Sequence, residues 1–193
     1  MTYGHPCSPD GQRPGPPDRG EGRPGNPPPY CRRSAWRRPL TGPDIPGLFQ
    51  TEEYMRAVFT LSAPQLSDAE RELQIQHRLQ RQQLIEPEAR VPQEAIIHES
   101  ALRMRFGGRK AARAQLDRVL ELAHRDDISV RVVTYDAEGF AGLGSPVMYA
   151  CSAVPQLDTV QLDALHGVLF LDAEAQLAWY RLLLALIHSL KTE

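Results

Sequence analysis

The chain has 193 residues, of which 41% are hydrophobic and 24% are charged, and its formal net charge is −2. These values are close to the average of globular domains, and so small a net charge excludes binding to nucleic acid through the overall charge of the chain. Three cysteines without a C-x-x-C pair indicate neither a disulfide framework nor a redox motif, and they fit a reducing cytoplasm. The first thirty residues lack an apolar signal segment, and glycines and prolines interrupt the uncharged run over residues 141–157, so we expect neither secretion nor a membrane span.

The composition divides the chain into two parts. Residues 1–40 hold ten of the 17 prolines and six of the 14 glycines, with seven arginines against three acidic residues. Proline bars regular helix, glycine raises the entropy lost on ordering, and few apolar residues are present to compensate. We therefore expect a disordered, Pro/Gly/Arg-rich tail over residues 1–43 and one folded domain over residues 44–193. The basic cluster around Trp36 can contact nucleic acid or an anionic surface, although a solvated tail is the favoured interpretation.

Helical periodicity begins directly after the Pro-Gly turn in residues 45–50, which we call the entry segment. The apolar spacing that follows predicts a helix over residues 51–61. Ser67 and Glu70 form a capping box, which predicts a second helix up to about residue 85. Its expected apolar stripe consists of Leu73, Ile75, Leu79 and Leu84.

Strand patterns and two further helices follow. Gly107-Gly108 predicts a turn, after which residues 110–124 are expected to form a helix that faces inward with Leu116, Val119, Leu120 and Leu122. Asp172 is a suitable N-cap for a last helix, which should end near residue 190. β-prone segments lie at residues 95–98, 128–133, 147–151, 160–165 and 168–171, and the last four suggest an antiparallel meander. The expected fold is α+β, with a small antiparallel sheet packed against several helices.

Familiar catalytic and metal-binding motifs are absent from the sequence. His98-Glu99 would need a second histidine at position 102 to form a zinc-binding helix, and that position is leucine. The glycines over residues 139–145 do not have the spacing of a phosphate-binding loop, and no G-x-S-x-G motif occurs. Cys151 is expected to be a buried strand residue rather than a nucleophile. We therefore expect no metal, no cofactor and no catalytic residue.

Arginines are the remaining candidates for a binding site. Arg78 and Arg81 lie three residues apart and share one face of the predicted second helix, so they can hold an anion or a carboxylate-rich partner. Together with Glu99, Arg103 and Asp163 they form the candidate ligand-binding or partner-binding set. Internal ion pairs or simple solvation are the favoured alternative. A pocket between the second helix and the sheet is the expected location of a ligand.

Several segments, taken in order, resemble a known family. Residues 45–54 resemble the entry motif P-G-L-L-Q-T-x-x-Y, residues 78–82 match R-x-x-R-Q, and residues 99–103 resemble an E-x-x-L segment. The alternating strand at 128–133 and the closing helix complete the order. Residues 44–191 thus resemble the C-terminal domain of unknown function of actinobacterial (Streptomyces-type) XRE/WhiJ-like helix-turn-helix transcriptional regulators, which are also described as antitoxin-like. The family usually has a glutamate near position 163, where this chain has aspartate.

This resemblance implies a non-enzymatic regulatory domain that binds a small-molecule ligand or a small protein partner. The family usually carries a helix-turn-helix before the entry motif, where this chain has its tail. We therefore expect a cytoplasmic domain without a DNA-binding module of its own, which contacts DNA only indirectly. An alternative is a small enzyme that uses Glu99 or Asp163 as a base and the arginines as an anion clamp. A third hypothesis is a homodimer formed through the first or the last helix.

Overall fold

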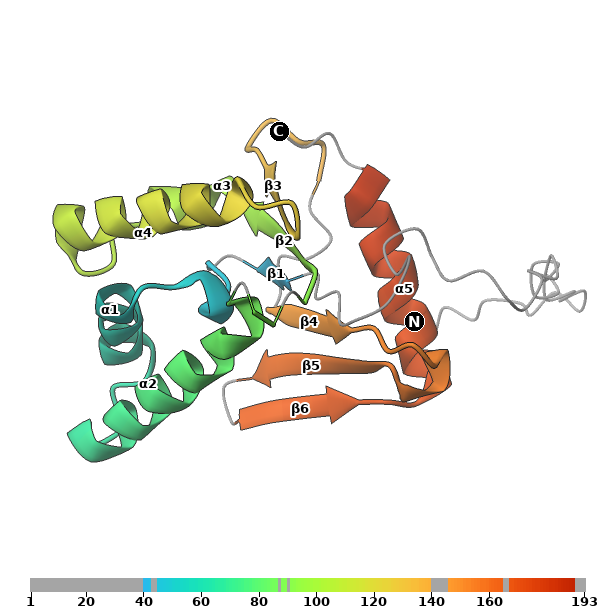
Figure 1. Cartoon of the computed structure of the whole chain (residues 1–193), viewed down its shortest axis with the longest axis horizontal. Helices are drawn as coiled ribbons and strands as arrows, with labels where there is room; N and C mark the ends of the chain where they lie inside the picture. The colour runs from blue at the N-terminus through green and yellow to red at the C-terminus, as the bar shows by residue number, and fades with distance from the viewer. Residues whose placement is uncertain are drawn as a thin grey trace, which may run out of the picture.

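The computed structural model describes residues 40–42, 45–86, 88–89, 91–139, 146–164 and 167–189 (Figure 1). Its helices and strands, in chain order, are β1 (Leu40–Gly42), α1 (Glu52–Ser62), α2 (Asp68–Gln82), β2 (Gln93–His98), α3 (Glu99–Arg103), α4 (Gly108–Ala123), β3 (Ile128–Val133), β4 (Val147–Ala150), β5 (Thr159–Ala164), β6 (Gly167–Leu171) and α5 (Glu174–Ser189). Short 3-10 helices lie at Gly47–Phe49, Gln83–Ile85 and Pro155–Leu157.

The strands form one six-stranded sheet in the order β3-β2-β1-β4-β5-β6. β1, β2 and β3 run parallel to one another, whereas β4, β5 and β6 form an antiparallel meander. β1 joins the two halves because it pairs in parallel with β2 and antiparallel with β4. Neighbouring parallel strands need a long connection, and α3 and α4 provide it between β2 and β3.

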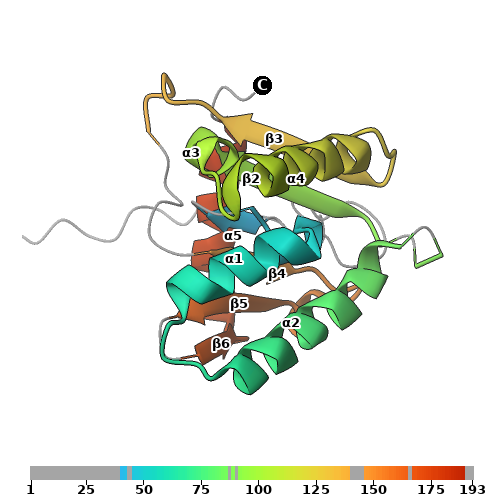
Figure 2. The ribbon, with the colours of Figure 1, turned by 90° about the vertical axis from the view of Figure 1, so that its left-hand side faces the viewer.

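Helices cover both faces of this sheet (Figures 1 and 2). α5 packs on one face, where the buried cluster includes Tyr149, Val160, Leu177 and Leu184. The entry segment, α1 and α4 pack on the other face of β2, in a cluster that includes Phe49, Tyr54, Ala95, Ile97 and Val119. Figure 2 looks onto this second face and shows α1 between α4 and α2, with the sheet behind them.

The α+β prediction, with a small antiparallel sheet packed against helices, is confirmed. One strand was misplaced, because β3 was expected in the antiparallel meander and instead lies at the far edge beside β2. The local alternation of its sequence carries no information about its neighbour or its direction. Leu40–Gly42 were assigned to the tail and form β1. The rest of the predicted tail and the glycine-rich segment over residues 140–145 lie outside the described residues.

The boundaries of the helices were predicted more accurately than the side chains that each helix buries. The capping box of α2 is present, and Gly107 and Gly108 both have positive φ angles at the start of α4. α5 begins at Glu174, so Asp172 does not occupy the N-cap position. Leu73 on α2 and Leu120 on α4 were expected inside but are 68% and 57% exposed.

Helical geometry explains why Leu73 is exposed, and one polar residue on α4 explains why the buried face of that helix was predicted wrongly. Leu73 is two positions from the buried Ile75, which places the two side chains about 200° apart around the helix axis. On α4, the buried face instead includes Gln115, which has no exposed surface at all. A rule that searches only for apolar side chains cannot select such a position.

Gln115 holds the entry segment in place. Its Nε2 donates a hydrogen bond to the carbonyl oxygen of Phe49 at 2.8 Å, and its Oε1 accepts one from the backbone N–H of Thr51 at 2.7 Å. Gln82 of α2 donates to the carbonyl oxygens of Gly47 and Gln50. The backbone between the Pro-Gly turn and α1 is irregular. The side chains of Gln115 and Gln82 therefore provide the hydrogen bonds that a neighbouring strand or a helical turn would otherwise provide.

Replacing Gln115 by leucine should lower the free energy of unfolding by about 2–5 kcal/mol, because the Phe49 carbonyl and the Thr51 N–H would lose their partners in a buried place. Urea denaturation followed by circular dichroism measures this difference. The exposed Gln80→Leu variant on α2 is the control, and we expect its stability to stay within about 0.5 kcal/mol of the wild type. Equal stability of Gln115→Leu and wild type would contradict a structural role for the two hydrogen bonds.

Candidate functional site

A cavity of about 500 Å³ lies between α2 and the antiparallel half of the sheet. This is where a pocket was expected from the sequence. α2 contributes Gln74, His77, Arg78 and Arg81 to its lining. The strands contribute Val147, Met148, Gln161 and Val168. α1 contributes Phe59, and the segments on either side of α1 contribute Leu48 and Leu66.

Arg78 and Arg81 both line this cavity, as their spacing on one helical face predicted. The guanidinium carbon of Arg78 lies 4.3 Å from the centroid of the Phe59 ring, and its Nη1 donates a hydrogen bond to Gln50 Oε1 at 3.2 Å. Arg81 contacts the sheet, where its Nη2 lies 3.6 Å from the Met148 sulfur. Both arginines are partly buried, so their charges are less screened than on an open surface.

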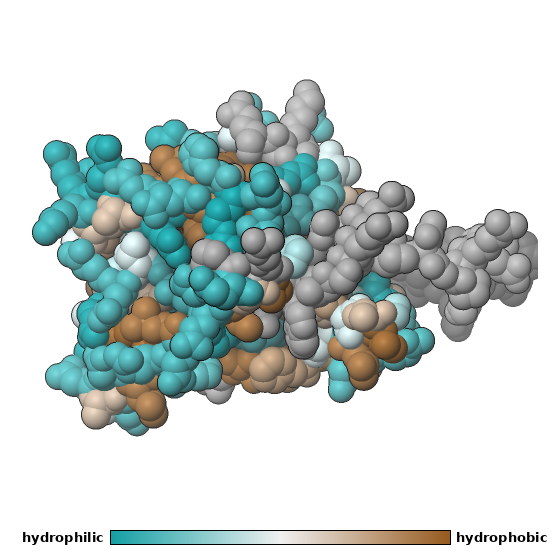
Figure 3. Space-filling view, viewed as in Figure 1, coloured by the Kyte–Doolittle hydropathy of each residue, from teal (hydrophilic) through white to brown (hydrophobic). Residues whose placement is uncertain are grey.

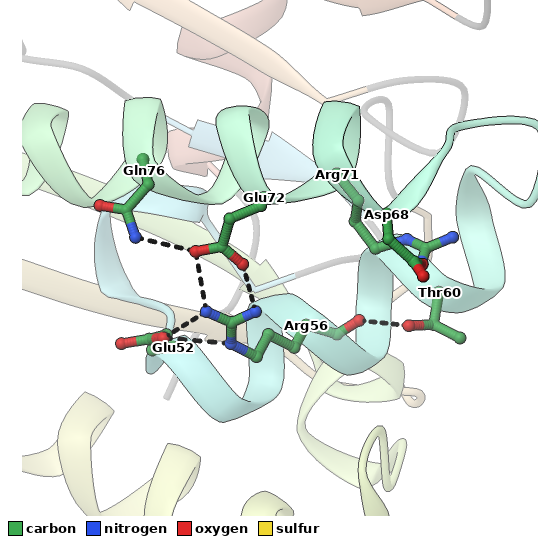
Figure 4. Close-up of polar contacts among 7 residues, drawn as sticks. All are labelled: Glu52, Arg56, Thr60, Asp68, Arg71, Glu72 and Gln76. Atoms are coloured by element: carbon green, nitrogen blue, oxygen red, sulfur yellow. Dashed lines mark hydrogen bonds and ion pairs between the residues drawn. The ribbon is translucent and has the colours of Figure 1, made fainter.

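The opposite face of α2 is attached to α1 by an ion-pair network (Figure 4). Arg56 of α1 contacts Glu52 at 2.7 Å and Glu72 of α2 at 2.6 Å, and Gln76 donates a further hydrogen bond to Glu72. These hydrogen bonds from Arg56 are the main reason why the pKa of Glu72 is lowered to about 2. Glu72 and Arg81 are nine residues apart, which is about 180° around the helix. The network therefore orients α2 with its arginines toward the cavity.

Met148, Gln161 and Val168, which line the cavity, lie on one face of β4, β5 and β6. Met148 pairs in register with Gln161, and Gln161 pairs with Phe170. Because side chains alternate along a strand, this row faces α2 while Tyr149 and Val160 face α5. At the edge strand β6, Val168 and Phe170 are more than half exposed and make an apolar rim. In Figure 3, hydrophobic residues gather near the lower edge, in the region of β5 and β6.

Glu99 and Arg103 lie elsewhere, in α3, and do not line the cavity. Glu99 Oε1 accepts a hydrogen bond from Arg103 Nε at 2.6 Å, and Glu99 Oε2 accepts one from the backbone N–H of Tyr135 at 3.0 Å. The backbone hydrogen bond and the Arg103 guanidinium hold the pKa of the Glu99 carboxyl below its usual range. Asp163 lies in β5 opposite Val168, which lines the cavity, and its side chain lies outside the described part of the structure.

Two other polar clusters attach α5 to the sheet. Arg181 Nε donates to the hydroxyl of the buried Tyr149 at 2.7 Å, and that hydroxyl donates to Asp158 at 2.8 Å. Burial and the Asp158 carboxylate raise the pKa of Tyr149. His188 lies 2.7 Å from Glu94 of β2, which raises the pKa of the imidazole. These groups are far apart in sequence, so spacing along the chain contains no signal for them.

The pocket residues that the sequence reasoning missed are of two kinds. Gln74 and His77 share the face of Arg78 and Arg81, so helical periodicity applied to polar residues would have found them. Met148 and Gln161 enter the site through the pairing of β4 with β5, and no local pattern predicts that register.

Other chemistry finds little support in the part of the chain that is described. Cys151 is buried, as expected, but it is disulfide-bonded, which corrects the expectation from the cysteine count and removes it as a nucleophile. The described ranges contain no group of three or more His, Cys, Asp or Glu side chains that could hold a metal ion. Within the same ranges, no helix combines the length and the apolar character needed to span a bilayer.

Comparison with known proteins gives one match. Searches among curated proteins and among solved structures returned no significant similarity. A family model described as Domain of unknown function (DUF5753) matches residues 39–190, which include every helix and strand described above. The chain therefore belongs to the DUF5753 family.

Proposed function

We propose that this domain is a ligand-binding regulatory domain of a helix-turn-helix transcriptional regulator of the antitoxin-like type. The observation that carries the proposal is the cavity between α2 and the sheet, with Arg78 and Arg81 in its wall. The resemblance of residues 44–191 to actinobacterial XRE/WhiJ-like regulators supports the regulatory role. In this proposal the domain acts in the cytoplasm, and contacts with DNA are made by a helix-turn-helix module outside it.

The size and position of the cavity favour a small-molecule ligand. Its volume of about 500 Å³ lies within the range of roughly 300–1,000 Å³ that is usual for drug-sized ligands. Its walls come from α2 on one side and from β4, β5 and β6 on the other. A ligand that contacts both walls stabilises one relative position of α2 and the sheet, and this is how binding would change the conformation presented to the rest of a regulator.

In this proposal Glu99 is a structural residue rather than the base of the enzyme alternative. A general base must lie within hydrogen-bond reach of the substrate, and its pKa should be near the working pH. Glu99 is outside the cavity, is held by Arg103 and the Tyr135 N–H, and has a lowered pKa. These contacts favour a structural role, in which the Glu99 carboxylate joins α3 to the turn after β3.

In this proposal the protein partner is a second copy of the chain, bound through α5. Trp179, Leu182 and Leu186 recur at three and four positions along α5, and all are more than half exposed. Ala175, Ala178 and Ala185 are also exposed along this stripe, which contains no charged residue. An uncharged stripe cannot form ion pairs with a charged partner. It can pack against an identical apolar stripe when two copies of the helix pair around a two-fold axis.

A pocket-filling variant tests the ligand-binding proposal. Val168→Trp places a large side chain at the cavity wall, and Leu169→Trp places the same side chain one residue along β6 on the opposite face. Ligand-observed NMR with a fragment library on full-length protein should give hits for wild type and Leu169→Trp that are lost in Val168→Trp. Hits that survive Val168→Trp unchanged would show that the cavity is not the binding site.

Glu99→Gln tests the enzyme alternative through pH. A lowered pKa in the folded state adds stability above the unfolded-state pKa of about 4.5, and this stability is lost as the pH falls through the folded-state value. Wild type should therefore be more stable than Glu99→Gln at pH 7, and the difference should shrink below pH 4.5. Thermal denaturation across this range measures it. A variant with unchanged stability at every pH would contradict the structural role and return Glu99 to the list of candidate bases.

Leu182→Lys tests the α5 interface. A charge in the centre of the apolar stripe should convert a dimer into a monomer, since burying an unpaired lysine is unfavourable. Light scattering coupled to gel filtration, over a series of protein concentrations, measures the mass. Leu120→Lys changes an equally exposed leucine on α4 and should leave the dimer intact. A wild-type chain that stays monomeric at every concentration tested would refute this part of the proposal.

A further inference from the structure

Arg81 differs from most arginines of the described structure in its hydrogen-bond partners. Seven of the others contact a carboxylate, namely Arg56, Arg71, Arg103, Arg113, Arg118, Arg125 and Arg181. Among the described side chains, no carboxylate pairs with Arg81, and its hydrogen-bond acceptor is the Met148 sulfur at 3.6 Å. A thioether is a weak acceptor, and a guanidinium has five N–H donors. Arg81 therefore presents strong donors to the cavity while it is itself partly buried.

The second arginine is already oriented for the same ligand. Arg78 is stacked on Phe59 and hydrogen-bonded to Gln50, whose own Nε2 donates to the Ile45 carbonyl oxygen at 2.7 Å. Gln50 is 3% exposed, and a change of its side-chain conformation would break the hydrogen bond to Ile45. Because these contacts restrict the Arg78 side chain before a ligand arrives, less conformational entropy is lost on binding. The cavity thus contains Arg78, which is held by contacts with Phe59 and Gln50, and Arg81, whose N–H groups can donate hydrogen bonds to a ligand.

The electrostatics of the cavity favour a small anionic group over a polyphosphate. Phosphates are commonly bound by backbone N–H groups at a helix N-terminus. α2 lines this cavity with residues 74–81, which lie in its C-terminal half, where the helix dipole is negative. Much of the remaining wall is apolar, including Leu48, Leu66, Met148 and Val168. A multiply charged ligand would lose more hydration there than two guanidinium groups can replace.

We propose that the cavity binds a monocarboxylate with an apolar body, on the basis of the ligand-binding function proposed above. The carboxylate accepts hydrogen bonds from the Arg81 guanidinium in the planar, bidentate arrangement that arginine favours, with Arg78 beside it. The apolar body lies between Leu66 of the α1–α2 connection and Met148 and Val168 of the sheet. Phe170 at the exposed rim extends this apolar wall for longer ligands.

The test uses full-length protein and matched pairs of probes in isothermal titration calorimetry. The probes are octanoate with octanamide, 4-phenylbutyrate with 4-phenylbutanamide, and pyrophosphate. Each carboxylate should bind wild type at least about tenfold more tightly than its amide, since a hydrogen bond to a charged group contributes more than one to a neutral group. Pyrophosphate should bind more weakly than either carboxylate.

The variants separate the role of Arg81 from a general effect of charge. Arg81→Gln should weaken carboxylate binding about tenfold or more and leave amide binding nearly unchanged. Arg113→Gln removes one positive charge from an exposed site on α4 and should alter neither affinity. Arg81→Gln should fold normally because the hydrogen bond that Arg81 makes within the described residues is a weak one, to the Met148 sulfur, and a thermal denaturation curve of the variant checks this.

Two results would overturn the proposed ligand class while leaving the binding function standing. One is equal affinity for carboxylates and amides, with both weakened by Val168→Trp. The other is tighter binding of pyrophosphate than of either carboxylate. If none of the five probes binds wild-type protein at millimolar concentration, the monocarboxylate is refuted, and fragment hits that depend on Val168 would still support the cavity as a site.

Discussion

The structure depends on how a short irregular segment, residues 45–51, is held between two helices. Its backbone polar groups have no strand or helix partner of their own, and buried groups without partners would be costly. Gln115 from α4 and Gln82 from α2 supply hydrogen bonds from opposite sides. Because the segment also places Leu48 and Phe49 in the core, the same glutamines connect both helices to a segment that packs in the core.

This arrangement links the core to the cavity. Gln50 is part of the entry segment, yet its Oε1 accepts a hydrogen bond from Arg78, so a residue that shapes the fold also orients a residue of the site. On the far side of α2, Arg56 and Glu72 attach the helix to α1. These ion pairs are exposed and each contributes little energy. Together with Gln82, however, they restrict rotation of α2 about its axis, and rotation is what would move the arginines out of the cavity.

Features of the fold that have a local physical signal could be predicted from the sequence. The capping box at Ser67, the turn at Gly107-Gly108 and the shared face of Arg78 and Arg81 all follow from spacings of one to three residues. Features that depend on contacts between distant segments could not be predicted. The position of β3 at the parallel edge, for example, depends on the crossover through α3 and α4, which the alternation within the strand does not encode.

Glu99 and Arg103 lie apart from the other two arginines, which the sequence also does not encode. Charge complementarity suggested one site, but the two residues lie four apart at one turn of helix and satisfy each other there. A charged side chain that pairs with a neighbour of opposite charge is less available to bind a ligand. Gln115 shows the opposite kind of error, in which a buried residue is predicted to be exposed. Hydropathy patterns assign this glutamine to the surface, although it has no exposed area.

The distribution of ion pairs is the ground on which we distinguish the proposed binding residues from structural ones in this domain. Residues 41–193 contain 21 acidic and 15 basic side chains, so an arginine has an excess of carboxylates with which to pair. Arg81 is an exception, because it is partly buried and its hydrogen-bond acceptor among the described side chains is a thioether rather than a carboxylate. Folding stability alone would favour pairing or exposing such a charge. Its position in a cavity with apolar walls is the reason why we propose an anionic ligand for it, and why the proposed function of the domain rests on the cavity beside α2.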